Sequence, residues 1–459
     1  MKYSKSAIHR KFHSLPELAF EDHRLTSFSG LIVFQALFAR LNLKGDLNRC
    51  FRHLKVSPIF GHGVVVMVLV VHLLLGYRRL RDLRYYADDP LVRRVLGLTR
   101  LPDVATLSRT MAGMDHHSAD QMRSMIRRTV GDRLARSGLK RVTVDFDGSV
   151  LSTGRFAEGT AVGFNRKKKG QRSYYPLFCT IAQTGQVFDL WHRSGNVHDS
   201  NGAVDFMRAC LRELRQRLGT GVVLEVRADS AFFSDEIVTL LGEAGVEFAL
   251  SVPFERFAEL KQLIENRKRW RRINRQYSFF EHWWAPKSWG WHYRFVFVRT
   301  RSVQRSKGPV QLDLFQPTDT CHDYQVVISN KSLSAGKIAR FYHGRGAQEG
   351  LFAELKSQIQ MDYVPTRREA GNRVYVLSAI LAHNLNRELQ MIVHQPVRKT
   401  NEKRSPLWSF ERLDTLRRTI IQRAGRLTRP NGKLKLTMSA NQATQDELLQ
   451  ILTALERAA

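Results

Sequence analysis

The chain has 459 residues, of which 73 are lysine or arginine and 42 are aspartate or glutamate, so its formal net charge is +31. A hydrophobic content of 43% excludes a disordered basic tail, and the charge excess is typical of a folded protein that binds a polyanion. The four cysteines (Cys50, Cys179, Cys210 and Cys321) have no CxxC spacing, which excludes a disulfide framework and a zinc site of that type.

Residues 1–138 are predicted to form a helical N-terminal DNA-binding region. Leu25 to Leu41 and Val64 to Leu83 carry long apolar faces. Leu101 to Thr110 reads as a polar helix start followed by an arginine-bearing helix, which is typical of a helix-turn-helix element. An ordinary helical connection is the alternative for that segment.

The most apolar run, Val64 to Leu75, is shorter than the about 20 residues that a membrane helix needs, and it contains His72. We therefore expect a buried helix there and no membrane association. Residues Met1 to Ser6 are not followed by the apolar core of a signal peptide. Together with the scattered cysteines, this predicts a cytoplasmic protein.

Residues 139–395 are predicted to form the catalytic domain. Val142 to Asp147 and Val222 to Asp229 read as buried strands that each end in an acid. The other predicted elements are strands over 176–181, 187–191 and 247–252 and helices over 201–218 and 234–244. Three strands, a helix, a strand, a helix and a strand is the order of a ribonuclease-H-like α/β core, with acids on its first and fourth strands.

Residues 254–330 are dense in arginine, lysine and aromatic side chains, and alternation over Tyr293 to Val298 and Tyr324 to Ile328 indicates strands. We expect an inserted β-rich subdomain there. Residues 396–459 are predicted to form a basic, helical C-terminal region.

One polar stripe lies between residues 341 and 356. If this segment is one α-helix, Tyr342, Arg345, Glu349 and Lys356 fall within about 60° of one another at 100° per residue. Glu354 points elsewhere. A mixed-charge helix face is usually solvated surface, but three glycines each cost a helix roughly 1 kcal/mol relative to alanine. Close approach of a bulky partner would explain Gly344, Gly346 and Gly350.

Three acids are candidates for metal-assisted phosphodiester chemistry. That chemistry uses two divalent cations about 3.5–4 Å apart, and Mg²⁺ prefers oxygen ligands. Asp147, Asp229 and Glu349 could supply them from separate elements. Each acid alone could instead cap a turn. Asp145 is a rival to Asp147 because both point to the same face of a regular strand, but Asp147 lies nearer the strand end.

These motifs resemble bacterial insertion-sequence transposases with a DDE triad. The stripe spells their Tyr-x2-Arg-x3-Glu-x6-Lys signature, and Val144 to Ser149 and Arg227 to Phe233 look like their first two acid motifs. Gly163 to Gly170 and Ser173 to Pro176 resemble one branch, the transposase DDE domain group 1. The resemblance covers about 30–395, and Gly148 stands where serine or threonine is expected.

The resemblance implies that Asp147, Asp229 and Glu349 hold two Mg²⁺ ions, with Mn²⁺ as an alternative. The substrate would be double-stranded DNA, both the terminal inverted repeats and the target. The element would be cut and pasted, through a hairpin in several relatives, by a homodimer bridging two ends near the bacterial nucleoid. The implied or expected DNA contacts are Tyr342, Arg345, Lys356, Arg166, Lys167, Lys168, Lys169, Arg269, Arg271 and Arg272. The candidates for stacking on a flipped base are Trp283, Trp284, Trp289 and Trp291.

Two other functions are compatible with the same residues. A ribonuclease-H-like nuclease would cut DNA without joining it to a target. A DNA-binding regulator would use the N-terminal helices and the basic surface with no chemistry.

Overall fold

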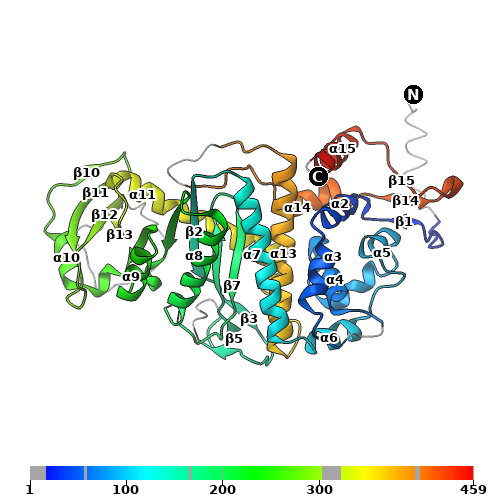
Figure 1. The fold of residues 1–459 in the computed structure, drawn as a ribbon, viewed down its shortest axis with the longest axis horizontal. Helices are drawn as coiled ribbons and strands as arrows, with labels where there is room; N and C mark the ends of the chain where they lie inside the picture. Colours follow the sequence, from blue (N-terminus) through cyan, green and yellow to red (C-terminus); the bar gives the residue numbers. More distant parts are fainter. Residues whose placement is uncertain are drawn as a thin grey trace.

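The fold comes from a computed structural model, which describes residues 17–55, 59–163, 165, 168–198, 200–301, 322–398 and 404–457. Figure 1 shows an elongated molecule with a helical part at one end, a β-rich part at the other and a sheet between them. Among the described residues, no helix has the length and apolar character needed to cross a membrane.

The centre of the molecule is a mixed sheet that contains nine strands within the described residues, in the order β10-β11-β12-β13-β9-β8-β2-β6-β7. Five of its strands are β2 (Arg141–Gly148), β6 (Leu177–Ile181), β7 (Gln186–Trp191), β8 (Val223–Ala228) and β9 (Glu247–Val252). Strand β2 runs antiparallel to β6 and parallel to β8, and β8 runs parallel to β9. These strands lie where the alternation of the sequence predicts them, and the chain is a mixed α/β protein.

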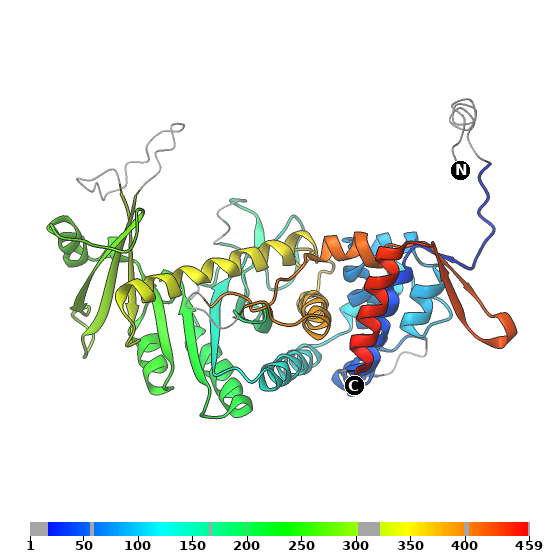
Figure 2. The ribbon, with the colours of Figure 1, turned by 90° about the horizontal axis from the view of Figure 1, so that it is seen from above.

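Helices cover both faces of this sheet. Helices α8 (Ala203–Leu218) and α9 (Asp235–Glu243) lie on one face, and α11 (Ala335–His343) and α12 (Ala347–Ser357) cross the other (Figure 2). Phe146 of β2 packs edge-on against Phe206 of α8, whereas Gln348 of α12 donates to the Asp145 carbonyl on the opposite face. The alternation of β2 therefore separates its core side from its site side.

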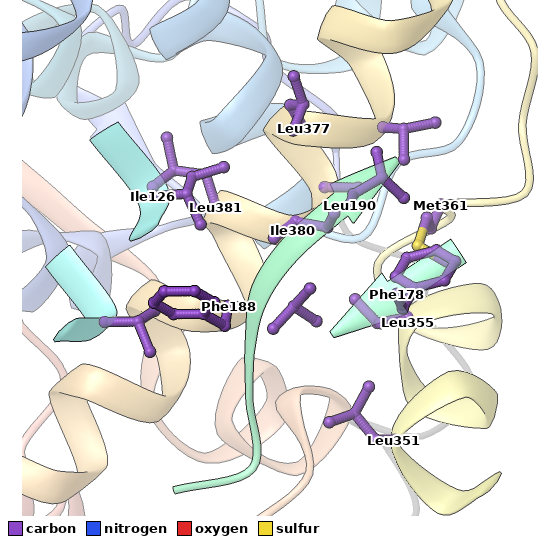
Figure 3. Packing of buried hydrophobic residues seen from close by; sticks show 14 of the residues in the cluster. Ile126, Phe178, Phe188, Leu190, Leu351, Leu355, Met361, Leu377, Ile380 and Leu381 are labelled. Atoms are coloured by element: carbon purple, nitrogen blue, oxygen red, sulfur yellow. The ribbon is translucent and has the colours of Figure 1, made fainter. Parts of the chain in front are cut away.

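The core beside β7 joins elements from distant parts of the sequence. It lies between β6, β7, α12 and the helices α7 (His116–Arg136) and α13 (Glu369–Val393). Figure 3 shows side chains of this core, among them Ile126, Phe178, Phe188, Leu190, Leu351, Leu355, Leu377, Ile380 and Leu381. Burial of this apolar surface is the main force that holds α12 against the sheet.

The predicted β-rich insertion is built as a continuation of the central sheet. Its strands are β10 (Arg271–Arg272), β11 (Tyr277–Trp284), β12 (Tyr293–Arg301) and β13 (His322–Ser329), with α10 (Ala258–Glu265) packed alongside. Strand β13 pairs antiparallel with β9. That pairing satisfies the backbone groups of β9 that would otherwise form an open sheet edge.

A small sheet that the sequence reading did not predict follows β2. It consists of β3 (Leu151–Thr153), β5 (Arg172–Tyr174) and β4 (Ala161–Val162), in that order. Its strands are two or three residues long, too short for alternation to reveal them.

The N-terminal region is helical in the structure, and the C-terminal residues fold back onto it. The helices before α7 are α2 (Ile32–Arg40), α3 (Leu43–Cys50), α4 (His62–Leu74), α5 (Pro90–Leu96) and α6 (Val104–Ala112). The chain ends in α14 (Leu413–Leu416), the hairpin β14 (Gly425–Thr428) and β15 (Lys435–Met438), and α15 (Gln442–Arg457). Strand β14 pairs with β1 (Leu25–Thr26), and α15 packs against α2.

The predicted basic, helical C-terminal region contains the helices α14 and α15 and also a hairpin that was not predicted. Residues 425–438 form a hairpin because β1, near the other end of the chain, offers it an edge for pairing. The first and last described segments share one core, to which α2 and α15 both contribute buried side chains.

We predict that Gly30→Ala disturbs the packing between the N-terminal and C-terminal segments and so lowers the stability of the protein. A Cβ at Gly30 would lie 1.9 Å from the Ile420 carbonyl oxygen, a backbone atom that cannot move alone. Overpacking of this kind costs about 1–3 kcal/mol, so the melting temperature measured by circular dichroism should fall. Gly61→Ala is the matched control, because a Cβ there meets nothing within 4 Å. Equal melting temperatures for the two variants would contradict the close approach.

Candidate active site

Asp147 and Asp229 lie at the carboxyl ends of two adjacent parallel strands. In the pairing of β2 with β8, Phe146 is opposite Ala228, so the next residue on each strand reaches the same edge. Asp229 accepts from the Ala231 backbone N–H at 3.0 Å and so caps a short 3₁₀ turn. This edge is where open α/β sheets place ligands.

Arg345 lies beside both carboxylates. Its Nη2 is 2.8 Å from Asp147 Oδ2 and 3.9 Å from Asp229 Oδ2. Burial by itself would lower the pKa of the guanidinium, but the negative charge of Asp147, assisted by Asp229, raises that pKa above its ordinary value. The group therefore remains a cation, and the two aspartates share one positive charge.

Asp145, the alternative to Asp147, belongs to the core. Both of its carboxylate oxygens accept from Arg227, at 2.6 Å from Nε and 2.7 Å from Nη2, and both side chains are buried. Arg227 also donates to the Phe341 carbonyl oxygen at 2.9 Å. Asp145 thus joins β2, β8 and the end of α11, and Asp147 is left as the acid at the strand end.

The polar stripe is not one regular α-helix. A 3₁₀ turn, Gly344–Gly346, separates α11 from α12. A 3₁₀ turn advances about 120° per residue rather than 100°, so the residues before and after it are not aligned as predicted. Arg345 points to the aspartates, whereas Glu349 is exposed. The turn does not require its glycines, because Gly344 and Gly346 have right-handed backbone angles, and a Cβ on Gly346 or Gly350 would meet nothing within 4 Å.

Tyr342 is buried, with 6% of its surface exposed. Burial raises the pKa of its phenol, an effect that the positive charge of Arg345 opposes, and its hydroxyl is hydrogen-bonded to Ser251. In this conformation the phenol is not offered to a phosphate from solvent, contrary to the expectation for a DNA contact. Tyr342 instead helps to hold α11 against the sheet.

A cavity of about 940 Å³ opens beside Asp229. Lys356, the last residue of the stripe, lies on its wall, together with Lys168, His198 and Arg256. The cavity therefore has several basic groups beside one of the candidate acids. Polyanions enter such a site readily because local positive potential concentrates them.

The other predicted DNA contacts are exposed where they are described. This holds for Lys168, Lys169, Arg269, Arg271 and Arg272, whereas Arg166 and Lys167 lie outside the described residues. The structure divides the four tryptophans. Trp284 is buried and Trp289 stacks on Phe233 at 4.9 Å, so both belong to the core, whereas Trp283 and Trp291 are 64% and 78% exposed.

The donor set fits a divalent cation only in part. Asp147 and Asp229 supply the oxygen ligands that Mg²⁺ prefers, and Mg²⁺ is often held by one or two carboxylates plus substrate phosphates. Within the part of the chain that the structure describes, no three His, Cys, Asp or Glu side chains lie close enough to hold a metal. Glu349 is thus not gathered with the aspartates, whose charge Arg345 now balances.

Sequence reasoning missed the role of Arg227 and the partner of Glu354. Arg227 lies two residues before Asp229 and opposite Asp145 in the register, so strand alternation could have placed it on the site face. Glu354 is buried in an ion pair with Arg387 of α13, which agrees with its exclusion from the metal set. No spacing in the sequence indicates that second pair.

Comparison with known proteins assigns the family. The family model described as transposase DDE domain group 1 matches residues 9–459, and the chain belongs to this family. The family supports a DNA transposase, an enzyme of the nuclease and transposase class. No curated protein matches the chain. This chain also aligns with a cryo-EM structure of the piggyBac transposase synaptic complex with hairpin DNA, with a sequence identity of 13% and a TM-score of 0.40. The alignment covers 85% of this chain and 80% of that chain.

We predict that Asp145→Asn lowers the free energy of unfolding more than Asp147→Asn does. Asp145→Asn leaves the buried Arg227 cation without its counter-charge, which costs on the order of 3–5 kcal/mol. Asp147→Asn should cost about 1 kcal/mol or less, because solvent reaches the pair and Asp229 remains near Arg345. Urea unfolding of both variants measures the difference. A similar loss in both would contradict the structural role of Asp145.

Proposed function

We propose that the chain is the transposase of a bacterial insertion sequence, which binds the terminal inverted repeats, cuts the element's ends and joins them to target DNA. The observation that carries the proposal is the meeting of Asp147 and Asp229 at adjacent strand ends, beside a basic cavity. The order and directions of β2, β6, β7, β8 and β9 support a ribonuclease-H-like core.

In this proposal Asp147 and Asp229, joined by Glu349, hold two divalent cations, Mg²⁺ or Mn²⁺. When bound, such ions activate a hydroxyl and neutralise charge on the phosphorus centre. Glu349 is on α12, one turn after Arg345, on a side of the helix with open space at Gly346 and Gly350. A shift of this helix segment on DNA binding would bring its carboxylate to the aspartates.

Arg345 has two roles in the proposal. Without substrate it offsets part of the negative charge of the two aspartates. Its buried Nε has no hydrogen-bond acceptor among the described residues, so a phosphate oxygen could be bound there. A guanidinium binds phosphate through two parallel hydrogen bonds, and Lys356 on the cavity wall would add a second positive charge.

The remaining parts of the proposal concern the assembly. Residues 1–138 would bind DNA, 139–395 would form the catalytic domain and 396–459 would complete the N-terminal unit. The exposed Trp283 and Trp291 are the better candidates for stacking on a base flipped from a hairpin end. Two copies of the chain would bridge the two ends of the element.

The first test removes each acid. Asp147→Ala, Asp229→Ala and Glu349→Ala should each lower cleavage of end DNA with Mg²⁺ by at least about a thousandfold, because they act as one unit. Gel-shift binding of the same DNA should persist. Asp205→Ala, whose acid is exposed on the opposite face of the sheet, is the control and should cut normally.

Joining of a pre-cut end to a plasmid separates transposition from simple cleavage. The wild type should join such ends in the presence of Mg²⁺. Cutting without joining under these conditions would identify a nuclease. Full cutting by any one of the three alanine variants would remove that acid from the site.

A second test addresses the balance between Arg345 and a cation. In Arg345→Ala the aspartates lose the positive charge of this guanidinium, so Mn²⁺ should bind at least about tenfold more tightly, a change of about 1.4 kcal/mol. Isothermal titration calorimetry measures this without any reaction. Arg345→Lys retains the charge and should stay close to the wild type. Weaker binding in Arg345→Ala would contradict the competition.

A further inference from the structure

A second, arginine-lined hollow adjoins the candidate active site. Two overlapping cavities of about 700 and 750 Å³ share Ser108, Thr153, Arg155, Val364 and Pro365 in their walls. Their walls contain Arg78, Arg79, Arg81, Arg155, Arg367 and Arg368. We call the combined hollow the arginine groove.

The arginine groove is continuous with the cavity beside Asp229. Ser152 and Asp362 line both that cavity and the first part of the groove. A chain of phosphates that enters the active-site cavity would therefore meet the groove directly. The candidate acids lie at one end of a longer basic path.

The walls of the groove come from segments that are distant in the sequence. Arg79 and Arg81 precede α5, and Ser108 is on α6, in the N-terminal region. Arg155 follows β3, and Arg367 lies just before α13. The positive charge of the hollow thus comes both from the N-terminal region and from segments that follow β2 in the sequence.

Most of this charge is not neutralised by the protein. Arg78 pairs with Asp362 at 2.7 Å, and the exposed Arg368 lies 3.9 Å from Glu158. For the other four arginines, no carboxylate among the described residues lies within ion-pair distance. Some arginines outside the groove do have carboxylate partners, as with Arg123 and Arg127 on Asp189. Uncompensated cations that line one hollow repel one another, and a bound polyanion would relieve that repulsion.

The groove also offers an aromatic face. Phe156 is 67% exposed on its wall, beside Arg155, and the Arg172 guanidinium lies 5.1 Å from the centre of its ring. An exposed phenyl ring among arginines fits a nucleic acid better than a simple anion, because the sugars of a duplex supply apolar surface next to the phosphates. Helix α6, predicted as a DNA contact, forms part of the same wall through Val104 and Ser108.

We propose that the arginine groove binds the double-stranded DNA that continues from the end held at the candidate active site. The phosphates along a duplex would contact arginines that the N-terminal region, the segment after β3 and the segment before α13 contribute. The N-terminal region and the catalytic domain would therefore hold one duplex between them. The inference rests on the proposed function only for the position of the reacting phosphate.

The test compares two sets of three substitutions that remove equal charge. The groove set is Arg81→Ala, Arg155→Ala and Arg367→Ala. The control set, on exposed positions of α8 and α15, is Arg208→Ala, Arg212→Ala and Arg457→Ala. Binding to a fluorescein-labelled duplex is measured by anisotropy in EDTA at several salt concentrations, with thermal unfolding as a check on folding.

The groove set should weaken duplex binding by roughly tenfold or more and reduce the slope of log K against log salt by about 2 to 3, since each phosphate contact contributes about 0.9. The control set should change neither quantity comparably. Equal effects of the two sets would overturn the proposal, as would loss of binding only to single-stranded DNA of the same length. If the groove set fails to fold, the single variants Arg155→Ala and Arg155→Lys are compared instead. Arg155→Ala removes the positive charge and should weaken duplex binding, whereas Arg155→Lys retains the charge.

Failure of this inference is distinguishable from failure of the proposed function. Binding in EDTA requires no chemistry. A groove set that loses binding, in a protein whose wild type neither cuts nor joins DNA, would support the groove and reject the transposase mechanism. Normal binding by the groove set, in a protein that cuts and joins ends, would reject the groove alone.

Discussion

The site depends on one buried ion pair, between Arg227 and Asp145. It joins β8 to β2 side by side, and a third bond from Arg227 to the Phe341 carbonyl attaches the end of α11 to the same point. A buried pair tolerates little displacement, because a separated charge would lie uncompensated in the core. The register that it maintains brings Asp147 and Asp229 to one edge of the sheet. A slip of either strand by one residue would turn the acid of that strand to the other face.

The charges at that edge are arranged as expected for the protein without DNA. Arg345 balances the two aspartates, Tyr342 is buried beside it, and Glu349 faces outward after the 3₁₀ turn of Gly344–Gly346. The positive charge of Arg345 reduces the repulsion between the two carboxylates, which like charges at short range would otherwise exert on each other. Assembly of a three-acid site would then be coupled to the arrival of phosphates that attract Arg345. This coupling would restrict cutting to DNA that is already bound.

Segments that look like separate modules in the sequence are joined to the rest of the molecule by strand pairing. The β-rich insertion extends the central sheet through β13 and β9, and the C-terminal hairpin pairs with β1. Both joints arise because an unpaired strand edge leaves backbone donors and acceptors unsatisfied. The N-terminal helices and the small sheet that follows β2 both contribute residues to the arginine groove.

The sequence by itself determined the family, the positions of β2, β6, β7, β8 and β9 along the chain and the presence of acids at the ends of β2 and β8, because alternation and strand-ending acids are local patterns. It left Asp145 and Asp147 unresolved, since residues two apart share a face, and it aligned Glu349 with Arg345 by assuming one regular helix. Only the tertiary structure decided these points, through Arg227 across the sheet and the 3₁₀ turn between α11 and α12. The same holds for the buried Trp284 and the arginine groove, whose burial and walls are set by contacts between distant segments.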